Sequence, residues 1–461
     1  MTIQEVVEMS PKYLIKSESS AVPAGYKQTE VGVIPEDWQC KTLGEMGDVV
    51  RGGSPRPAGD PKYFNGNFIP WLTVASLTNI PSSKIYVTET LTKLTELGSL
   101  QSRVLEKGSL IISNSGATLG VAKILGIKCC ANDGVAAIIN QRIGSKEFLV
   151  HYINTQTKKL QDQIATGNGQ PNLNTDLIKG IFTPYPPLEE QIAIATALSD
   201  VDALIGELEK LITKKQAIKT ATMQQLLTGR TRLPQFALRE DGSKKGYKQS
   251  ELGEIPEDWV AVTLGHIAKF LKGSGLPKSE LSESGKYPCI HYGQLFTTYG
   301  SKIDLVISKT QTVGIIKSQE NDILMPTSDV TPNGLATASC ITIPGVVLGG
   351  DILVIRADKK ILNGVFFAYV VSLIRDQIMQ LVTGSTVYHL YGSDMATLRF
   401  TLPQFEEQNA IAKILSDMDD ELQALEQRLN KTRQIKQGMM QELLTGKTRL
   451  MQPEKDEYEH D

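Results

Sequence analysis

One pattern of this chain occurs twice, and the two copies keep the same register from start to end. The first copy begins with Pro-Pro-Leu-Glu-Glu-Gln at 186–191 and ends with Leu-Leu-Thr-Gly at 226–229. The second begins with Pro-Gln-Phe-Glu-Glu-Gln at 403–408 and ends with Leu-Leu-Thr-Gly at 443–446. Such a repeat constrains the fold strongly, because both copies are expected to adopt the same structure.

Each copy is predicted to be one long helix, because proline precedes it and glycine ends it. Apolar residues recur within it at the three-four spacing of a coiled coil. A helix of roughly 40 residues is about 60 Å long, and with a single apolar stripe it is marginal alone in water. We therefore expect the two stripes to bury each other; they comprise Leu198, Val201, Ile205, Leu208 and Ile212, and Leu415, Met418, Leu422, Leu425 and Leu429.

Charge indicates that the two helices are antiparallel. In both copies acidic residues fill the first part and basic residues the rest, so each helix complements its own dipole. An antiparallel pair sets acidic halves against basic halves. The ends of a compact intervening domain also tend to lie close together, which favours the same direction. The alternative is two unrelated amphipathic helices on separate cores, but the shared register and ends favour the pair.

A second repeated pattern opens a globular segment before each helix. Gly-Tyr-Lys-Gln at 25–28 and Ile-Pro-Glu-Asp-Trp at 34–38 return at 246–249 and 255–259. We interpret the two tryptophans as structural anchors of a domain entrance. Short β-type runs punctuated by Gly, Pro and Asn, together with helical stretches, predict a mixed domain after each entrance. The domain interiors share little sequence, which indicates one architecture with two specificities.

The predicted fold class is therefore α+β, with two mixed α/β domains joined by two long antiparallel coiled-coil helices in a pseudo-two-fold arrangement. The boundaries expected from the two repeats are an N-terminal arm at 1–24, a first domain at 25–185, a first helix at 186–228, a linker at 229–245, a second domain at 246–402, a second helix at 403–445 and a tail at 446–461.

Composition excludes several classes of protein. Residues are 41% hydrophobic and no apolar run approaches the length of a membrane span, so we expect a cytoplasmic protein without a signal peptide or membrane contact. The five cysteines lack metal-binding spacing and are expected to be reduced core residues. With 48 basic and 51 acidic residues, the net charge of −3 means that any DNA contact is local or completed by a partner.

Polar loops follow strand-like runs in both domains. Asn and Gln can bond bidentately to adenine, and Ser and Thr can bond bases or phosphates. Taken alone, each loop is better explained as an ordinary polar turn, but both domains place one at the same distance before the helix, which favours a function. The candidates for DNA contact are Ser113, Asn114, Ser115, Thr118, Asn168, Gln170 and Asn172 in the first domain, and Thr327, Ser328, Ser385, Thr386, Tyr388 and His389 in the second.

Four basic residues flank glycine-rich turns: Arg51, Arg56, Lys272 and Lys278. They are candidates for phosphate contact, and a solvated surface charge is the alternative for each. Catalytic patterns are missing from the sequence. We find no GxxxxGK phosphate loop, no G-x-G-x-x-G after a strand, and no HExxH or HxE among the five histidines. We therefore expect no active site and no metal in this chain.

Taken together, these patterns resemble the specificity subunit of type I restriction–modification systems. The resemblance rests on the Glu-Glu-Gln helix starts, the Leu-Leu-Thr-Gly helix ends and the Ile-Pro-Glu-Asp-Trp entrances. Gly-Ser-Pro-Arg at 53–56 and Ile-Pro-Trp at 69–71 add to it in the first domain. The second domain departs from this pattern, with Lys-Gly-Ser-Gly at 272–275 and no Pro-Trp pair.

The resemblance implies that each domain is a target-recognition domain for one half of a split site in double-stranded DNA. The helices would set the gap and dock two methyltransferase subunits, and restriction/translocase subunits would join them. S-adenosylmethionine, ATP and magnesium would be bound by those partners and none by this chain. The alternatives are the recognition subunit of another restriction system with a fused methylase–nuclease, a coiled-coil scaffold that binds protein or glycan, and an enzyme whose site is not recognisable.

Overall fold

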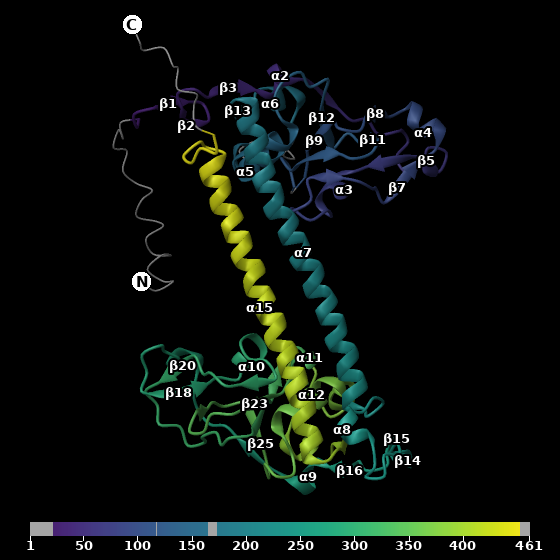
Figure 1. Ribbon diagram of the computed structural model, residues 1–461, viewed down its shortest axis with the longest axis vertical. Helices are drawn as coiled ribbons and strands as arrows, with labels where there is room; N and C mark the ends of the chain where they lie inside the picture. The colour runs from purple at the N-terminus through teal and green to yellow at the C-terminus, as the bar shows by residue number, and fades with distance from the viewer. Residues whose placement is uncertain (1–21, 117, 165–172, 452–461) are drawn as a thin grey trace. The chain divides into compact units, whose positions relative to one another are not determined.

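The computed structural model describes residues 22–116, 118–164 and 173–451 (Figure 1). Two compact units are present. Unit 1 contains the chain up to Lys210 together with the part from Gln427 on, and unit 2 is Leu211–Glu426. The two predicted helices are α7 (Leu188–Leu227) and α15 (Phe405–Leu443), of 40 and 39 residues. Each of these two helices contributes one segment to unit 1 and another to unit 2. Each unit therefore combines a globular domain with two helix segments that are distant in sequence.

The unit 1 domain is built on two sheets, and a strand pair joins its start to its end. Hairpin β1–β2 (Tyr26–Thr29, Gly32–Pro35) opens it, and β3 (Gln39–Thr42) pairs with β13 (Phe182–Tyr185) directly before α7. The five-stranded sheet has the order β4 (Asp48–Arg51), β12 (Val135–Ile139), β9 (Leu110–Ser113), β10 (Ala122–Leu125), β6 (Tyr86–Val87). The four-stranded sheet has the order β7 (Thr92–Leu94), β5 (Phe64–Leu72), β11 (Cys129–Ala131), β8 (Arg103–Leu105). The helices are α2 (Leu43–Met46), α3 (Val74–Thr78), α4 (Glu96–Leu100), α5 (Lys146–Ile164) and α6 (Thr175–Lys179).

The unit 2 domain follows the same plan. After α8 (Pro234–Ala237) come hairpin β14–β15 (Tyr247–Ser250, Gly253–Pro256) and the pair β16–β27 (Val260–Thr263, Arg399–Leu402). The five-stranded sheet has the order β17 (Ala268–Lys272), β25 (Ile352–Ala357), β21 (Asp322–Pro326), β23 (Ser339–Ile341), β19 (Lys302–Ile303). A three-stranded sheet has the order β20 (Ser308–Thr310), β18 (Tyr287–Ile290), β24 (Val347–Leu348). A two-stranded sheet pairs β22 (Ser328–Asp329) with β26 (Tyr388–His389). The remaining helices are α9 (Leu264–Ile267), η1 (Lys278–Glu280), α10 (Gln294–Thr297), α11 (Pro332–Leu335), α12 (Gly364–Leu373), α13 (Arg375–Met379) and α14 (Gly392–Met395).

The two domain interiors therefore share a topology that their sequences do not reveal. In both five-stranded sheets the pairs are antiparallel except the last, β10 with β6 and β23 with β19, which is parallel. Core strands need only apolar side chains of fitting size, so the residues can change while the strand order is kept. The mixed α+β class predicted for both domains is confirmed.

Within each unit, α7 and α15 pack along their apolar stripes in opposite directions. In unit 1 Leu198, Ile205 and Leu208 of α7 are buried, as is Leu429 of α15. Lys436 of α15 pairs there with Asp202 of α7 at 2.7 Å, and in unit 2 Lys215 pairs with Glu421 at 2.7 Å. Because the beginning of one helix meets the end of the other in both units, the pair is antiparallel, as charge predicted. The remaining stripe positions are buried at Leu415 and Leu422, and half-buried at Val201, Ile212, Met418 and Leu425.

Four residues tie the end of α15 to the entrance of the unit 1 domain, and we call them the unit 1 clasp: Asp37, Trp38, Glu190 and Arg449. The Nε1–H of the fully buried Trp38 donates to Glu190 Oε2 at 3.0 Å. Arg449 donates to both oxygens of Glu190 and of Asp37 at 2.7–2.9 Å. Its guanidinium also lies 5.6 Å from the Trp38 ring centre. The predicted structural role of the tryptophan is confirmed.

Unit 2 contains a matching clasp of Arg232, Asp258, Trp259 and Glu407. Trp259 donates to Glu407 Oε2 at 3.0 Å, and Arg232 bonds both carboxylates. Burial alone would raise the pKa of Asp258, but hydrogen bonds from Arg232 and Lys245 outweigh it and lower this pKa to about 2. Each clasp thus fixes one helix end on one domain through charge-assisted, bidentate bonds, which are the strong kind.

Candidate nucleic-acid interface

In unit 1, the turn between β11 and β12 gathers the predicted basic residues. This turn lies so close to Gly52 that a Cβ there would sit 2.0 Å from the carbonyl oxygen of Asn132, so only glycine fits. Asp133 in the turn accepts from Ser54 Oγ at 2.6 Å, and its backbone carbonyl accepts from Arg51 Nε at 2.7 Å. Arg56 approaches the Asp133 carboxylate at 3.5 Å.

The Asp133 carboxylate is held in its charged form. The hydrogen bond from Ser54 is the largest cause that lowers its pKa, and Arg51 and Arg56 add to it. Arg51 and Arg56 are nevertheless exposed. Two guanidinium groups are therefore held near one anchored carboxylate while keeping free surface, a geometry in which they can still meet a phosphate.

The polar loop after β9 divides into buried and accessible residues. Ser113 and Asn114 are buried and bond inside the domain, Ser113 Oγ to the Thr118 carbonyl and Asn114 Nδ2 to the Asp133 carbonyl at 3.2 Å. Both residues support the loop from inside the domain. Their polar groups bond to backbone carbonyls of the same loop and of the turn between β11 and β12. Ser115 and Thr118 are half-buried and remain candidates for contact. Asn168, Gln170 and Asn172 lie outside the described residues.

In unit 2, the turn before β25 plays the same part. A Cβ at Gly273 would lie 1.9 Å from the Gly349 carbonyl oxygen, matching Gly52 in unit 1. Asp351 in this turn lies 3.7 Å from Lys272 Nζ, and its carbonyl accepts from the Thr327 N–H at 2.9 Å. Gly273 and Lys272 thus stand where Gly52 and Arg51 stand in the other unit, and Asp351 takes the register position of Gly134, one residue after Asp133.

The strand pair β22–β26 brings the two predicted polar loops of unit 2 together. Ser328 pairs with His389, and the Leu390 N–H donates to the Thr327 carbonyl at 3.0 Å. Thr327, Ser328, Tyr388 and His389 therefore form one surface, although about 60 residues separate the loops in sequence. Two reciprocal backbone bonds between Thr383 and His389 close the intervening turn, where Ser385 and Thr386 are exposed.

A cavity of about 490 Å³ opens beside this surface. Lys272, Thr327 and His389 supply polar groups, and the aromatic rings of His389 and Tyr391 lie nearly parallel, 6.1 Å apart. The remaining wall is largely apolar: Phe270, Leu271, Leu353 and Leu390. Apolar walls with a few convergent polar groups suit a planar, partly apolar ligand such as a base edge. Lys278 is exposed in η1 and lies outside this lining.

The sequence interpretation missed Asp133 and Asp351, which hold these clusters together. The signals were present, because Asn-Asp-Gly at 132–134 and Gly-Gly-Asp at 349–351 are turn sequences between apolar runs. Within the described residues, no group of three or more His, Cys, Asp or Glu side chains is arranged to hold a metal ion. None of the helices in that part of the chain is long and apolar enough to cross a bilayer.

The chain is similar to specificity subunits of type I restriction enzymes. A putative type I restriction enzyme MjaX specificity subunit of Methanocaldococcus jannaschii is 27% identical over 458 residues, which is 92% of this chain and 97% of that protein. The MjaVIII specificity subunit of the same organism is 24% identical, covering 90% of this chain and 94% of that protein. A crystal structure of a type I restriction-modification S subunit from M. genitalium shares the fold with a TM-score of 0.57 at 16% identity, over 88% of this chain and 96% of that one.

A family model described as the type I restriction modification DNA specificity domain matches residues 35–220 and 256–437. The two matched stretches each include one domain and most of the helix that follows it, in agreement with the repeated organisation of the two units. They cover most of the chain, and the chain therefore belongs to the family of type I restriction-modification DNA specificity proteins.

Proposed function

We propose that this chain is the non-catalytic specificity subunit of a type I restriction–modification complex, and that each domain reads one half of a bipartite site in double-stranded DNA. One observation carries the proposal most directly. In two domains with divergent interiors, a glycine beside a basic residue admits a turn that carries an aspartate next to a polar loop. Basic groups fix a protein on phosphates, and polar loop side chains can read base edges.

Differences between the two clusters support two different half-sites. Unit 1 presents two arginines, Arg51 and Arg56, whose planar forks suit bidentate contacts with phosphate or guanine. Unit 2 presents Lys272, a point charge, beside the cavity with His389. The same scaffold with different reading groups is what a site with two unlike halves requires.

The proposal extends to the helices, which would set the distance between the half-sites and dock two methyltransferase subunits. Several large apolar side chains of α7 and α15 remain exposed after the helices have packed on each other, which leaves apolar surface for a partner. They are Leu188, Ile192, Leu204, Leu211, Ile218 and Ile435. Restriction/translocase subunits would then join the complex, and S-adenosylmethionine, ATP and magnesium would be bound by the partners.

The test is genome-wide detection of methylated bases in the host with and without this chain. The proposal predicts that one methylated motif, two short half-sites around a fixed gap, disappears when the chain is deleted and returns when it is restored. If co-expression of the chain with a type I methyltransferase subunit of its host leaves the DNA unmarked, and the purified complex binds all duplexes equally, the scaffold alternative is favoured.

A further inference from the structure

Each domain exposes two large apolar side chains on the connection that leaves the edge strand of one of its sheets. We call these connections the unit 1 tip, which is residues 95–102 after β7, and the unit 2 tip, which is residues 311–316 after β20. In both tips the apolar side chains are more than half exposed. They are Leu97 (51%), Leu100 (78%), Val313 (64%) and Ile315 (84%).

The two tips occupy the same place in the fold. Before the tip, each edge strand pairs antiparallel with its neighbour, β7 with β5 and β20 with β18. That neighbour pairs in parallel with the next strand, β11 or β24. After the tip, Val104 pairs antiparallel with Cys130 of β11, and Lys317 with Val347 of β24. Single exposed apolar residues are ordinary, but pairs at one position of two domains that share little sequence indicate a function.

The unit 1 tip lies against the glycine-rich loop of the candidate nucleic-acid interface. The Arg56 N–H donates to Gln101 Oε1 of the tip at 3.3 Å. Arg103, which directly follows the tip, donates through Nε to the Arg51 carbonyl at 2.7 Å and is exposed. Glu96, in the first turn of α4, balances part of this positive charge. The apolar pair of the tip therefore continues the basic surface of unit 1.

The unit 2 tip lies against the segment that carries the candidate phosphate contact Lys278. Thr312 Oγ1 in the tip donates to the Glu280 carboxylate of η1, the short helix that Lys278 begins. Lys317 directly follows the tip and is exposed, as Lys278 is. As in unit 1, two exposed basic side chains thus flank the apolar pair.

Apolar side chains between basic ones fit the minor groove of DNA. Many proteins that bind there insert Leu, Ile, Phe, Met or Pro between base steps, with Arg or Lys beside the wedge, and kink the duplex by about 20–90°. A protein partner fits less well, because a stable protein interface buries on the order of 1,200 Å² or more, far above what two side chains offer. A wedge requires only one or two side chains, which is what each tip presents.

We propose that each tip inserts an apolar wedge into the minor groove, Leu100 from unit 1 and Ile315 from unit 2, and unstacks one base step in the half-site of its domain. These two side chains are the more exposed of each pair. Pyrimidine–purine steps such as TA unstack most easily, so each wedge adds a sequence preference at bases that the polar loops do not contact. This inference rests on the proposed function, because it requires that both domains bind duplex DNA.

The test uses the assembled complex with methyltransferase subunits and a duplex that carries the motif found by methylation mapping. The fluorescent base 2-aminopurine, which brightens when it unstacks, is placed at successive positions of each half-site. The methylated position is left out, because enzymes that modify a base extrude it from the stack. Energy transfer between labels at the two ends of the same duplex measures its bend. The wild-type complex should give one unstacked step in each half-site.

Leu100→Ala should abolish the unstacking signal in the unit 1 half-site alone, and Ile315→Ala that in the unit 2 half-site alone. Each substitution should also reduce the bend by about 20° or more. Both side chains are exposed, so both variants should fold. Leu91→Ala and Leu305→Ala are matched controls. Leu91 is exposed but precedes β7, at the other end of this strand from the tip.

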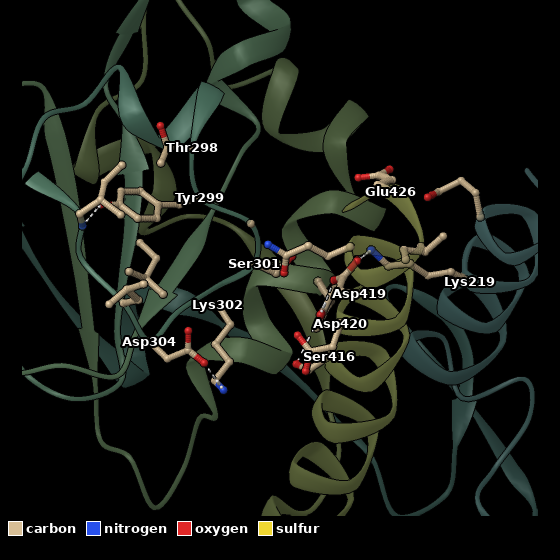
Figure 2. Close-up of a pocket in the computed structure, with 18 residues that line it drawn as sticks. Lys219, Thr298, Tyr299, Ser301, Lys302, Asp304, Ser416, Asp419, Asp420 and Glu426 are labelled. Atoms are coloured by element: carbon tan, nitrogen blue, oxygen red, sulfur yellow. Dashed lines mark hydrogen bonds and ion pairs between the residues drawn. The ribbon is translucent and has the colours of Figure 1, made fainter. Parts of the chain in front are cut away.

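Leu305 is exposed as well, but it lines a cavity of about 640 Å³ whose facing wall on α15 carries Asp420 and Glu426 (Figure 2). Those carboxylates repel DNA, so neither control should change the unstacking or the bend.

Unchanged unstacking in Leu100→Ala and Ile315→Ala, with a wild-type complex that still prefers its own motif, would overturn the wedge and leave the proposed function standing. A wild-type complex that binds motif and scrambled duplexes equally would overturn both. Weaker assembly of either variant with the methyltransferase subunits in the absence of DNA would also overturn the wedge, because it would assign the tip to a protein contact.

Discussion

At the scale of single residues, the arginines of the two clasps form the ion pairs that matter most for stability. Glu190 and Glu407 have side chains only 1% and 2% exposed, and Arg449 and Arg232 are the cations that balance them. A buried carboxylate without its partner retains the full cost of leaving water. The clasps therefore give a reason why Thr-Arg-Leu follows both long helices, at 231–233 and at 448–450.

Replacing Arg449 with alanine should destabilise unit 1 by about 3–5 kcal/mol, since Glu190 is left buried and unpaired. Denaturant unfolding monitored by tryptophan fluorescence would measure the change. Arg239→Ala is the matched control: Arg239 also bonds a carboxylate bidentately, that of Glu257, but it is exposed, so a loss of about 1 kcal/mol or less is expected. Equal losses in both variants would contradict the role of the clasp.

His151 gives unit 1 a specific sensitivity to acid. Burial lowers its pKa to about 4, the Lys436 ammonium adds to the shift, and Glu147 opposes it. Between pH 6.5 and 4 the unfolded chain binds a proton that the folded chain refuses, so stability falls as pH falls, by up to about 3 kcal/mol. Tyr369 occupies the matching position in unit 2, with the same 3.4 Å contact to a serine of the long helix.

Because glutamine does not titrate in this range, His151→Gln should flatten the dependence of the free energy of unfolding on pH between 6.5 and 4. Unfolding at a series of pH values would show it. His266→Gln, at an exposed position of α9, should leave the slope unchanged. If the free energy of unfolding of His151→Gln depended on pH as strongly as that of the wild type, this assignment would be contradicted.

For DNA contact, Lys272 and His389 should have separable effects. Lys272→Ala should weaken binding of all duplexes by the assembled complex and reduce the slope of log K against log salt by about one. His389→Ala should change the preference among bases at one position, by about 1–3 kcal/mol, with the slope unchanged. Titrations with duplex variants at several salt concentrations separate the two, and the same effect from both substitutions would refute the division.

Whether the role of a residue could be predicted from the sequence depended on how far apart along the chain its contact partners lie. The tryptophan anchors and the apolar stripes follow from local patterns and are found as predicted. Arg449 and Glu190 are 259 positions apart, so no local pattern joins them, although both lie in repeated motifs. Ser113 and Asn114 were predicted as accessible loop residues because the sequence shows their polarity. Their burial depends on the packing of the domain around them, which the sequence does not show.

At the scale of elements, the helices were predictable and the sheets were not. Periodicity, a starting proline and an ending glycine define α7 and α15 almost to the residue. Strands of two to five residues carry too little pattern to show which of them pair, and the order β4-β12-β9-β10-β6 includes pairings distant in sequence, such as β4 with β12. The helical stretch 364–379 is divided into α12 and α13 at Ile374.

Replacing glycine with alanine should have opposite effects on stability inside the two helices and at their ends. Gly229 and Gly446 end the helices at φ +69° and +70°, and a Cβ there would lie 2.4 and 2.5 Å from Pro256 and Pro35. Gly206 and Gly438 lie inside the helices, where a Cβ meets nothing within 4 Å. Thermal unfolding of Gly206→Ala and Gly438→Ala should show a gain of about 0.5–1 kcal/mol each.

Gly229→Ala and Gly446→Ala should instead lose stability by about 1 kcal/mol or more, because the left-handed backbone and the nearby proline both oppose a Cβ. The four variants form a matched set, with the same substitution on the same two helices. A uniform gain from all four would mean that the helix ends are not fixed against the proline of the domain entrance.

At the scale of the whole molecule, the chain builds each unit from parts that are distant in sequence. The end of α7 is clasped to the second domain, and the end of α15 returns to the first, through Arg449 at the far end of the described chain. The sequence carries a sign of this organisation, because Gly-x-Thr-Arg-Leu follows both long helices, at 229–233 and at 446–450. The different interiors fit the proposal that each domain recognises its own half-site.

The most direct test of this account is to replace residues 25–185 with the equivalent domain of a relative and to map the methylated motif of the resulting complex. The account predicts that one half of the bipartite motif changes, while the other half and the length of the gap stay the same. A change in both halves, or in the gap alone, would contradict the assignment of one reader to each domain and of spacing to the helices.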